Sequence, residues 1–219
     1  MRARKGAARP VLLISATLVA VAAAAQQLTL PNKKDSLHFA VVGDTGTGGR
    51  QQAQIASQMA TFRKVFPFEF AIMLGDNLYG GEGTRDYENK FEKPYKPLLD
   101  GGVKFYASLG NHDDREQRNY KLFNMNGELY YTFKGSKQNV RFFALDSNAV
   151  DARQLEWLES ALRDSNEDWK IAFFHHALYS NANRHGSSVD IRVLLEPILV
   201  RHGVNVAFSG HDHVYERLT

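Results

Sequence analysis

The most constraining feature of this sequence is a repeated change from apolar to polar residues. Five apolar segments, each about the length of one strand, are followed at once by Asp, Asn or His, in most cases after a glycine. The segments are 37–42, 68–74, 103–109, 169–174 and 204–208. In open α/β sheets, ligands bind beyond the carboxyl ends of the strands. Five polar strand ends therefore predict one shared site.

The rest of the chain supports an α/β domain. Apolar residues at helical spacing predict helices over 51–65, over 151–163 with Asp151 as N-cap, and over 189–202. Pro197 lies inside the last of these, so we expect a kink or two shorter helices. Segments 130–133 and 140–145 predict a hairpin. The composition, 43% hydrophobic and 23% charged over 219 residues, is that of a globular protein.

The polar residues at the strand ends are suitable metal ligands. Carboxylate, amide and imidazole groups favour iron, manganese or zinc, and six or seven of them suit two ions that share a carboxylate. The candidates are Asp44, Asp76, Asn111, His175, His211 and His213. His211 and His213 alternate, so in an extended segment both face one side while Asp212 faces away. His175 and His176 are adjacent, so only one of them should bind a metal.

Five motifs in a fixed order resemble a known family. They are GDTG at 43–46, GDNLY at 75–79, GNHD at 110–113, FHH at 174–176 and GHDH at 210–213. Together they resemble the calcineurin-like metallophosphoesterases, and the tyrosine of GDNLY and the run GHDHVYER are similar to small, tartrate-resistant purple acid phosphatases. The resemblance covers about 38–217 and implies a four-layer α/β/β/α sandwich of two mixed sheets. In that family further strands complete the second sheet, so we expect this chain to lack the final C-terminal strands.

The resemblance also implies a role for each site residue. Asp44, Tyr79 and His213 would bind the first metal, Fe(III); Asp76 would bridge; and Asn111, His175 and His211 would bind the second metal, Fe(II), Zn or Mn. His112 would contact the substrate phosphate and protonate the leaving group, with Asp113 orienting it. His185 would be a second contact or acid. Two departures from the family pattern are Asp114, where a histidine is usual, and Ala177, where proline is usual.

The implied activity is that of an acid phosphatase, which hydrolyses phosphomonoesters by attack of a metal-bound hydroxide. Two alternatives stay open. One is a metallophosphodiesterase that acts on nucleotides or phospholipid head groups. The other is a protein that binds metal or phosphate without catalysis.

The first residues predict export. Four basic residues precede an apolar run, 11–25, that ends in three alanines, which is typical of a signal peptide over 1–25. The run is shorter than the roughly 20 residues of a membrane-spanning helix, so we expect cleavage, no stable membrane anchor, and a secreted or periplasmic protein whose phosphoesterase domain covers 35–219. Cleavage removes four basic and no acidic side chains, which changes the formal net charge from +3 to −1. A globally basic surface for nucleic acid is therefore not expected. The resemblance implies a small phosphate ester as the partner.

Overall fold

The computed structural model describes residues 33–218, and the predicted signal peptide lies outside them. The strands in this part are β1 (Phe39–Val42), β2 (Phe70–Leu74), β3 (Lys104–Ser108), β4 (Tyr131–Lys134), β5 (Val140–Ala144), β6 (Trp169–Phe173) and β7 (Val206–Phe208). The helices are α1 (Arg50–Phe62), α2 (Thr84–Tyr87), α3 (Lys93–Asp100), α4 (Ala152–Arg163) and α5 (Val189–Arg201), with a π-helical turn at Glu88–Glu92 and 3-10 turns at Arg115–Asn119 and Lys121–Phe123. No helix among these residues is long and apolar enough to cross a membrane.

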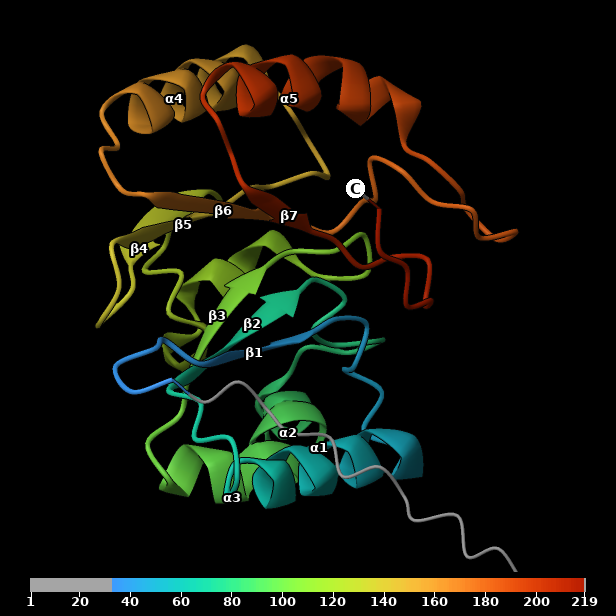
Figure 1. Cartoon of the computed structure of the whole chain (residues 1–219). Coiled ribbons are helices and arrows are strands. Elements are labelled where there is room, and N and C mark those ends of the chain that lie inside the picture. The colour runs from blue at the N-terminus through green and yellow to red at the C-terminus, as the bar shows by residue number, and fades with distance from the viewer. Residues whose placement is uncertain (1–32, 219) are drawn as a thin grey trace, which may run out of the picture. The chain divides into compact units, whose positions relative to one another are not determined.

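Two sheets lie face to face, and helices cover the outer face of each (Figure 1). The first sheet has the order β1-β2-β3 and the second β4-β5-β6-β7. Helices α1 to α3 lie outside the first sheet, and α4 and α5 lie outside the second, which confirms the predicted four layers. One detail differs, because only the second sheet is mixed. The strands of the first sheet are all parallel, since a helical segment separates each from the next, whereas β4 and β5 are joined by a short turn and run antiparallel.

The core between the sheets is built by alternating residues. Phe70, Ile72 and Leu74 of β2 pack against Phe142 and Phe173 of the second sheet. The intervening β2 residues face α1 and α3 in a second cluster, so β2 is buried on both faces and reads as a continuous apolar run. Each fully buried large side chain contributes about 1.5–3 kcal/mol. This packing fixes the strands whose ends carry the polar residues.

The helical region between β2 and β3 was not predicted. Tyr87, Phe91, Tyr95 and Leu98 have helical spacing and pack on the first sheet, but charged residues and two prolines between them obscure the pattern. The expectation of two shorter helices at Pro197 is wrong. Pro197 lies within α5, which continues to Arg201 as one helix rather than as two shorter ones.

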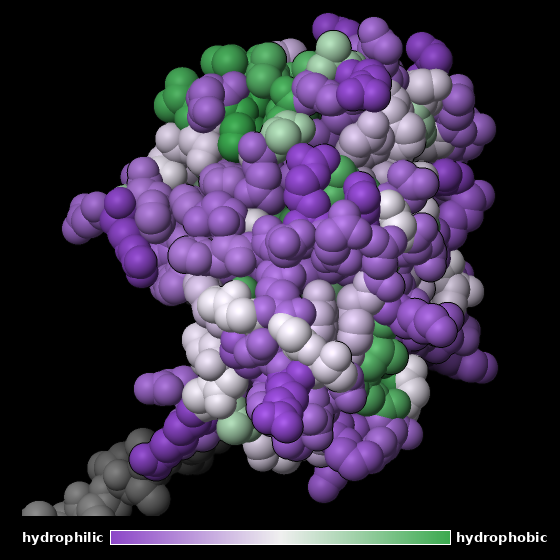
Figure 2. Space-filling model, turned by 180° about the vertical axis from the view of Figure 1, so that it is seen from behind, coloured by the Kyte–Doolittle hydropathy of each residue, from purple (hydrophilic) through white to green (hydrophobic). Residues whose placement is uncertain are grey.

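The outer face of α5 is unusually apolar. Val189, Val193 and Val200 are 51%, 62% and 72% exposed. Figure 2 shows a mainly hydrophilic surface with a hydrophobic area over the helical layer to which α5 belongs. β7 is at the edge of the second sheet within the described residues, and its Ala207 is exposed.

Candidate metal centre

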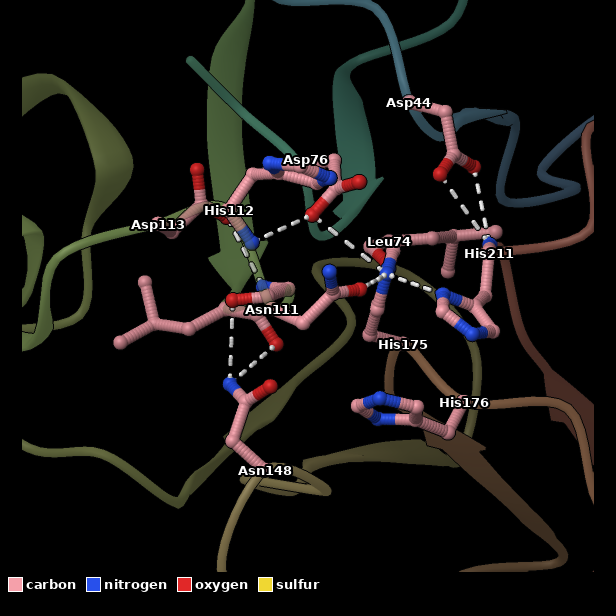
Figure 3. A network of polar contacts seen from close by, with 12 residues as sticks. Asp44, Leu74, Asp76, Asn111, His112, Asp113, Asn148, His175, His176 and His211 are labelled. Atoms are coloured by element: carbon pink, nitrogen blue, oxygen red, sulfur yellow. Dashed lines mark hydrogen bonds and ion pairs between the residues drawn. The ribbon is translucent and has the colours of Figure 1, made fainter. Parts of the chain in front are cut away.

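The loops after five strands meet at one place, as the sequence predicted (Figure 3). Backbone hydrogen bonds hold them together: Asp44 N donates to Gly75 O at 3.0 Å, and Gly210 N donates to His175 O at 2.9 Å. The His175 ring also crosses from one sheet to the other, because its Nδ1 lies 2.8 Å from the carbonyl oxygen of Leu74 at the end of β2. The strand ends of the two sheets therefore form a single cluster.

One half of the cluster contains two carboxylates, a phenol and an imidazole. Asp44, Asp76 and His213 each offer a ligand atom, and these three atoms lie within 4.8 Å of one another. His213 Nε2 is 3.4 Å from Asp44 Oδ1 and 3.3 Å from the Tyr79 hydroxyl. Four groups that can bind a hard or intermediate cation thus converge.

The other half is centred on His175, which is fully buried. Its Nε2 lies 3.0 Å from Asn111 Oδ1, 3.1 Å from His211 Nδ1 and 3.4 Å from Asp76 Oδ1. Asp76 therefore lies between the two halves, where a shared carboxylate is expected. All seven predicted metal ligands are brought together.

The hydrogen bonding of His175 tests whether this site suits a cation. A carbonyl oxygen only accepts, so Nδ1 carries the proton that points at Leu74, and Nε2 of the neutral ring carries a lone pair. That lone pair faces the Asp76 carboxylate at 3.4 Å. Two electron-pair donors that face each other repel, and a metal ion between them would satisfy both. The donor set fits the proposed metals.

The titration behaviour of the metal-free site agrees with this interpretation. Burial, and to a lesser extent the neighbouring Asp76, raises the pKa of Asp44 to about 7. Burial lowers the pKa of His175 and of His211 to about 4. Burial and the charges of Asp76 and Asp44 raise the pKa of Tyr79. The protein alone thus makes Asp44 and Tyr79 costly to ionise and keeps His175 and His211 neutral, a situation that bound cations would relieve.

The ligand residues adopt an uncommon backbone conformation. Asp44, Asp76, His211 and His213 have φ values of 56°, 50°, 76° and 50°. They are four of the seven non-glycine residues with positive φ in the described chain. Non-glycine residues in this region are strained by about 1–3 kcal/mol and are concentrated at functional sites.

Two glycines let the backbone approach these ligands. A Cβ on Gly110 would lie 2.2 Å from Asp76 Oδ1, and one on Gly210 would lie 2.6 Å from Asp44 Oδ2. Neither position could carry a side chain without moving a carboxylate.

The two predicted catalytic histidines border the cluster. The His112 ring lies 5.0 Å from the Tyr79 ring, and its backbone N–H donates to Asp76 Oδ1 at 3.0 Å. The His185 ring lies 4.0 Å from the His211 ring, and Asp212 accepts hydrogen bonds from the backbone of His185 and Gly186. Both histidines are exposed, as groups that meet a substrate must be. Asp212 is buried, and its carboxylate binds the His185 loop rather than a predicted metal ligand. The expected extended segment is wrong, because His211 and His213 have left-handed φ values of 76° and 50°.

The expected role of Asp113 is wrong. Its carboxylate accepts from the backbone N–H groups of Asn77, Leu78 and Gly110, and from the Gln117 side chain at 2.8 Å. These bonds hold the loop after β2 against the loop after β3. They do not involve the His112 ring, because the backbone turn directs Asp113 to the interior. Asp114 caps the following turn by accepting from Glu116 N at 2.9 Å.

Sequence reasoning missed two residues that support the site, in the loop after β5. Ser147 Oγ accepts from the backbone N–H groups of His175 and His176 and lies 2.9 Å from His176 Nδ1. Asn148 Nδ2 donates to the carbonyl oxygens of Leu109 and Gly110, at 3.2 and 3.1 Å. The same signal, polar residues directly after a strand, could have identified them.

His176 is also closer to the site than predicted. Its ring centroid is 4.6 Å from that of His211 and 5.0 Å from that of His175. Only His175 reaches Asp76 and Asn111, so the expectation that one of the two adjacent histidines joins the donor set is consistent with the geometry.

Comparisons with known proteins agree with the site. The family model described as calcineurin-like phosphoesterase matches residues 37–215. Purple acid phosphatase 17 of Arabidopsis thaliana is 26% identical over 89% of this chain and 68% of its own length. Human tartrate-resistant acid phosphatase type 5 is 26% identical over 86% of this chain and 71% of its own. The chain therefore spans about two thirds of the length of these relatives.

A solved structure supports the fold. A dimetal phosphatase from Danio rerio superimposes with a TM-score of 0.62 at 17% identity, covering 80% of this chain and 81% of the other. The family match covers most of the chain and includes all seven predicted metal ligands. The relatives named above are a purple acid phosphatase and a tartrate-resistant acid phosphatase. This protein belongs to the calcineurin-like phosphoesterase family.

Proposed function

We propose that this protein is a dimetal phosphatase that hydrolyses phosphomonoesters. The observation that carries the proposal is the convergence of Asp44, Asp76 and His213, whose ligand atoms lie within 4.8 Å of one another, next to the His175 cluster. Asp76 has contacts in both halves, which suits two ions better than one. The family and the names of the curated relatives support the same activity.

Each half of the site would hold one ion. Asp44, Tyr79 and His213 would hold the first and Asn111, His175 and His211 the second, with Asp76 shared. When bound, the two ions would acidify a water molecule toward a pKa of about 7, which supplies the nucleophile, and would withdraw charge from the phosphate. The site residues would fix both ions from loops that the two sheets hold rigidly.

The exposed histidines would handle the substrate and its proton. His112 is anchored through its backbone to Asp76, so its ring stays beside the ligands while it remains accessible. We assign it to the phosphate and to proton delivery onto the departing alkoxide oxygen, since imidazole is the most common general acid in enzymes. His185, whose loop Asp212 holds and whose ring lies 4.0 Å from that of His211, would be a second contact to the phosphate.

The metals proposed are Fe(III) in the half that contains Tyr79 and Fe(II), Zn or Mn in the other. A phenolate favours a trivalent ion because the strongly raised pKa of Tyr79 must be overcome on binding. Elemental analysis together with a visible spectrum tests this assignment. A protein with two metals, at least one of them iron, and a visible absorption band that is lost in Tyr79→Phe is expected. Two metals without iron would refute the assignment.

Turnover is tested with p-nitrophenyl phosphate and site variants. Asp76→Asn and His211→Ala should lose metal and activity, whereas His202→Ala, a histidine on the far side of the second sheet paired with Glu159, should keep both. Full activity in Asp76→Asn would refute the proposal. Faster hydrolysis of bis-p-nitrophenyl phosphate than of the monoester would favour the phosphodiesterase, and bound metal without turnover between pH 5 and 8 would favour a binding protein.

We also propose export with cleavage after Ala25. The support is the sequence alone: basic residues, an apolar run and a small-residue end. Expression with residues 1–25 should give a protein outside the cytoplasm that begins at Gln26, which N-terminal sequencing detects. Cytoplasmic protein that begins at Met1 would refute it.

A further inference from the structure

Lys90 is a largely buried cation that the proposed chemistry does not use. Its side chain is 14% exposed and lies in the π-helical turn Glu88–Glu92. Its Nζ donates to Tyr79 O at 2.7 Å and to Gly81 O at 2.9 Å, and it pairs with Asp86 Oδ1 at 2.6 Å. An ammonium group has three donors, so all of them are used.

Two of these three contacts are unlike those of an ordinary helical ion pair. A Lys–Asp pair one helical turn apart is common on surfaces and contributes little. Lys90 also reaches two backbone carbonyls of the loop that carries Tyr79, which follows β2. Burial of a charge is costly unless hydrogen bonds satisfy it, so this loop conformation and the buried ammonium depend on each other.

The same residue also contacts the loop after β1. Gln52 Nε2 donates to Lys90 O at 2.5 Å, and Gln52 Oε1 accepts from Gly48 N at 2.7 Å. A Cβ on Gly48 would lie 3.1 Å from Lys90 Cγ, so the loop packs directly on the lysine stem. Lys90 therefore lies where the loop of Asp44 meets the loop of Tyr79.

The two loops also bind each other directly. Tyr79 N donates to Gly46 O at 2.9 Å, two residues after Asp44. A shift of the Tyr79 loop would therefore move the Asp44 loop as well. The π-helical conformation around Lys90 is independent support, because such turns are rare and are frequent at functional sites.

We propose that Lys90 is a positioning residue for one half of the metal centre. Its ammonium fixes the loop of Tyr79, which the bond from Tyr79 N to Gly46 O joins to the loop of Asp44, and so sets the position of the ligand Tyr79 relative to Asp44. The inference rests on the proposed function, since it assigns Lys90 to that same site. Lys90 touches neither substrate nor metal.

The test compares Lys90→Met with Lys96→Met, using Zn²⁺ as the probe. Lys96 is a matched control because it lies in the adjacent helix α3, is 69% exposed and pairs with Asp100 on the surface. Competition with a chromogenic chelator gives the two Zn²⁺ dissociation constants. Loss of a residue that supports a ligand weakens metal binding about 10–100-fold. Lys90→Met should therefore raise one of the two Zn²⁺ dissociation constants by that factor and leave the other within about threefold of the parent value. Lys96→Met should change neither.

A double-mutant cycle separates positioning from a general loss of stability. If Lys90 acts through the Tyr79 loop, Lys90→Met and Tyr79→Phe should have clearly less than additive effects when both are present. The quantity compared is the free energy of Zn²⁺ binding at the site that Lys90→Met weakens. Lys90→Arg keeps a cation with several donors and should recover part of the affinity. If Lys90→Met does not fold, Lys90→Arg replaces it in the test. The Zn²⁺ affinity of Lys90→Arg must then lie between those of the parent and of Tyr79→Phe.

The outcomes distinguish the two proposals. A parent protein that binds no Zn²⁺ would refute the metal centre, and the role of Lys90 with it. A parent with two Zn²⁺ sites and a Lys90→Met variant with both affinities unchanged, or with both weakened equally, would refute the role of Lys90 alone. Additive effects in the cycle would do the same.

Discussion

Replacement of Gly110 by alanine should damage the metal centre far more than it damages the fold. Gly110 does not lie in the left-handed region, so alanine meets no backbone strain there. The added Cβ would lie 2.2 Å from Asp76 Oδ1, 2.3 Å from Asp76 N and 2.9 Å from His175 Cε1. Real Cβ atoms essentially never lie within 3.0 Å of such neighbours, so the loop of Gly110 and the side chain and backbone of Asp76 must move apart by about 0.8 Å.

The magnitudes follow from that displacement. A misplacement of about 1 Å in a catalytic site can lower the rate about 100-fold, and Asp76 is the group shared by both halves of the centre. Overpacking of this kind costs about 1–3 kcal/mol of folding stability. In a domain of this size that lowers the melting temperature by about 2–4 °C for each kcal/mol.

Gly102→Ala is the matched control. Gly102 has a φ of 78°, and no atom lies within 4 Å of the position that an added Cβ would take, so alanine there meets backbone strain but no neighbour. A left-handed alanine costs about 1–2 kcal/mol, similar to the cost at Gly110, yet far from any ligand. The assays are kcat/KM on p-nitrophenyl phosphate, bound metal and thermal unfolding. Similar melting temperatures with about 100-fold lower activity only in Gly110→Ala are expected, and equal activities would refute the reasoning.

Three other perturbations test the loop contacts, a buried ion pair and the metal itself. Asn148→Asp keeps the side-chain shape but replaces the amide that donates to Gly110 O with an acceptor, so kcat/KM should fall about 10–100-fold while the protein stays folded by circular dichroism. The carboxylate of Glu167 accepts hydrogen bonds from Arg141 and Lys134, which hold the pKa of Glu167 well below the ordinary value of 4.5. The contribution of this ion pair to stability is therefore present above pH 4.5 and is lost as the pH falls. Glu167→Gln should therefore cost about 1.5–3 kcal/mol in urea unfolding at pH 7 and less at pH 3.5, and an equal cost at both values would contradict the assignment. Removal of metal with a chelator should lower the melting temperature, and Zn²⁺ at about 100 times its dissociation constant should restore about 2.7 kcal/mol; no shift in calorimetry would argue against a site that binds the folded state.

The strand ends could be read from the sequence because they depend on local patterns. An apolar run followed by Gly-Asp or by Gly-Asn-His marks both the end of a strand and the start of a polar loop. Parallel strands place these ends at one edge, so six ligand candidates could be grouped before any contact was known, and the family resemblance added Tyr79. The four layers followed from the resemblance, and packing on both faces of β2 realises them.

Other features depend on contacts between distant residues and could not be read. The helices between β2 and β3 were missed because their stability comes from Phe91 and Tyr95 packing on the first sheet rather than from local propensity. Asp113 was predicted to orient the side chain of its neighbour His112. Its carboxylate instead accepts hydrogen bonds from the backbone of Asn77 and Leu78, 36 and 35 residues earlier. Sequence adjacency does not reveal which way a loop side chain turns.

The sequence by itself determined the kinds of ligand, their order and the strands that end beside them, because these depend on residue type and on local periodicity. Only the tertiary structure decided how the ligands face one another. Asp and His enter the left-handed region more readily than most non-glycine residues, but at Asp44, Asp76, His211 and His213 contacts with other loops hold the backbone there, such as the bonds from Asp44 N to Gly75 O and from His211 N to the Asp44 carboxylate. The support by Asn148 arises in the same way, since it joins the loop after β5 to the loop after β3, which only the packed sheets bring into contact.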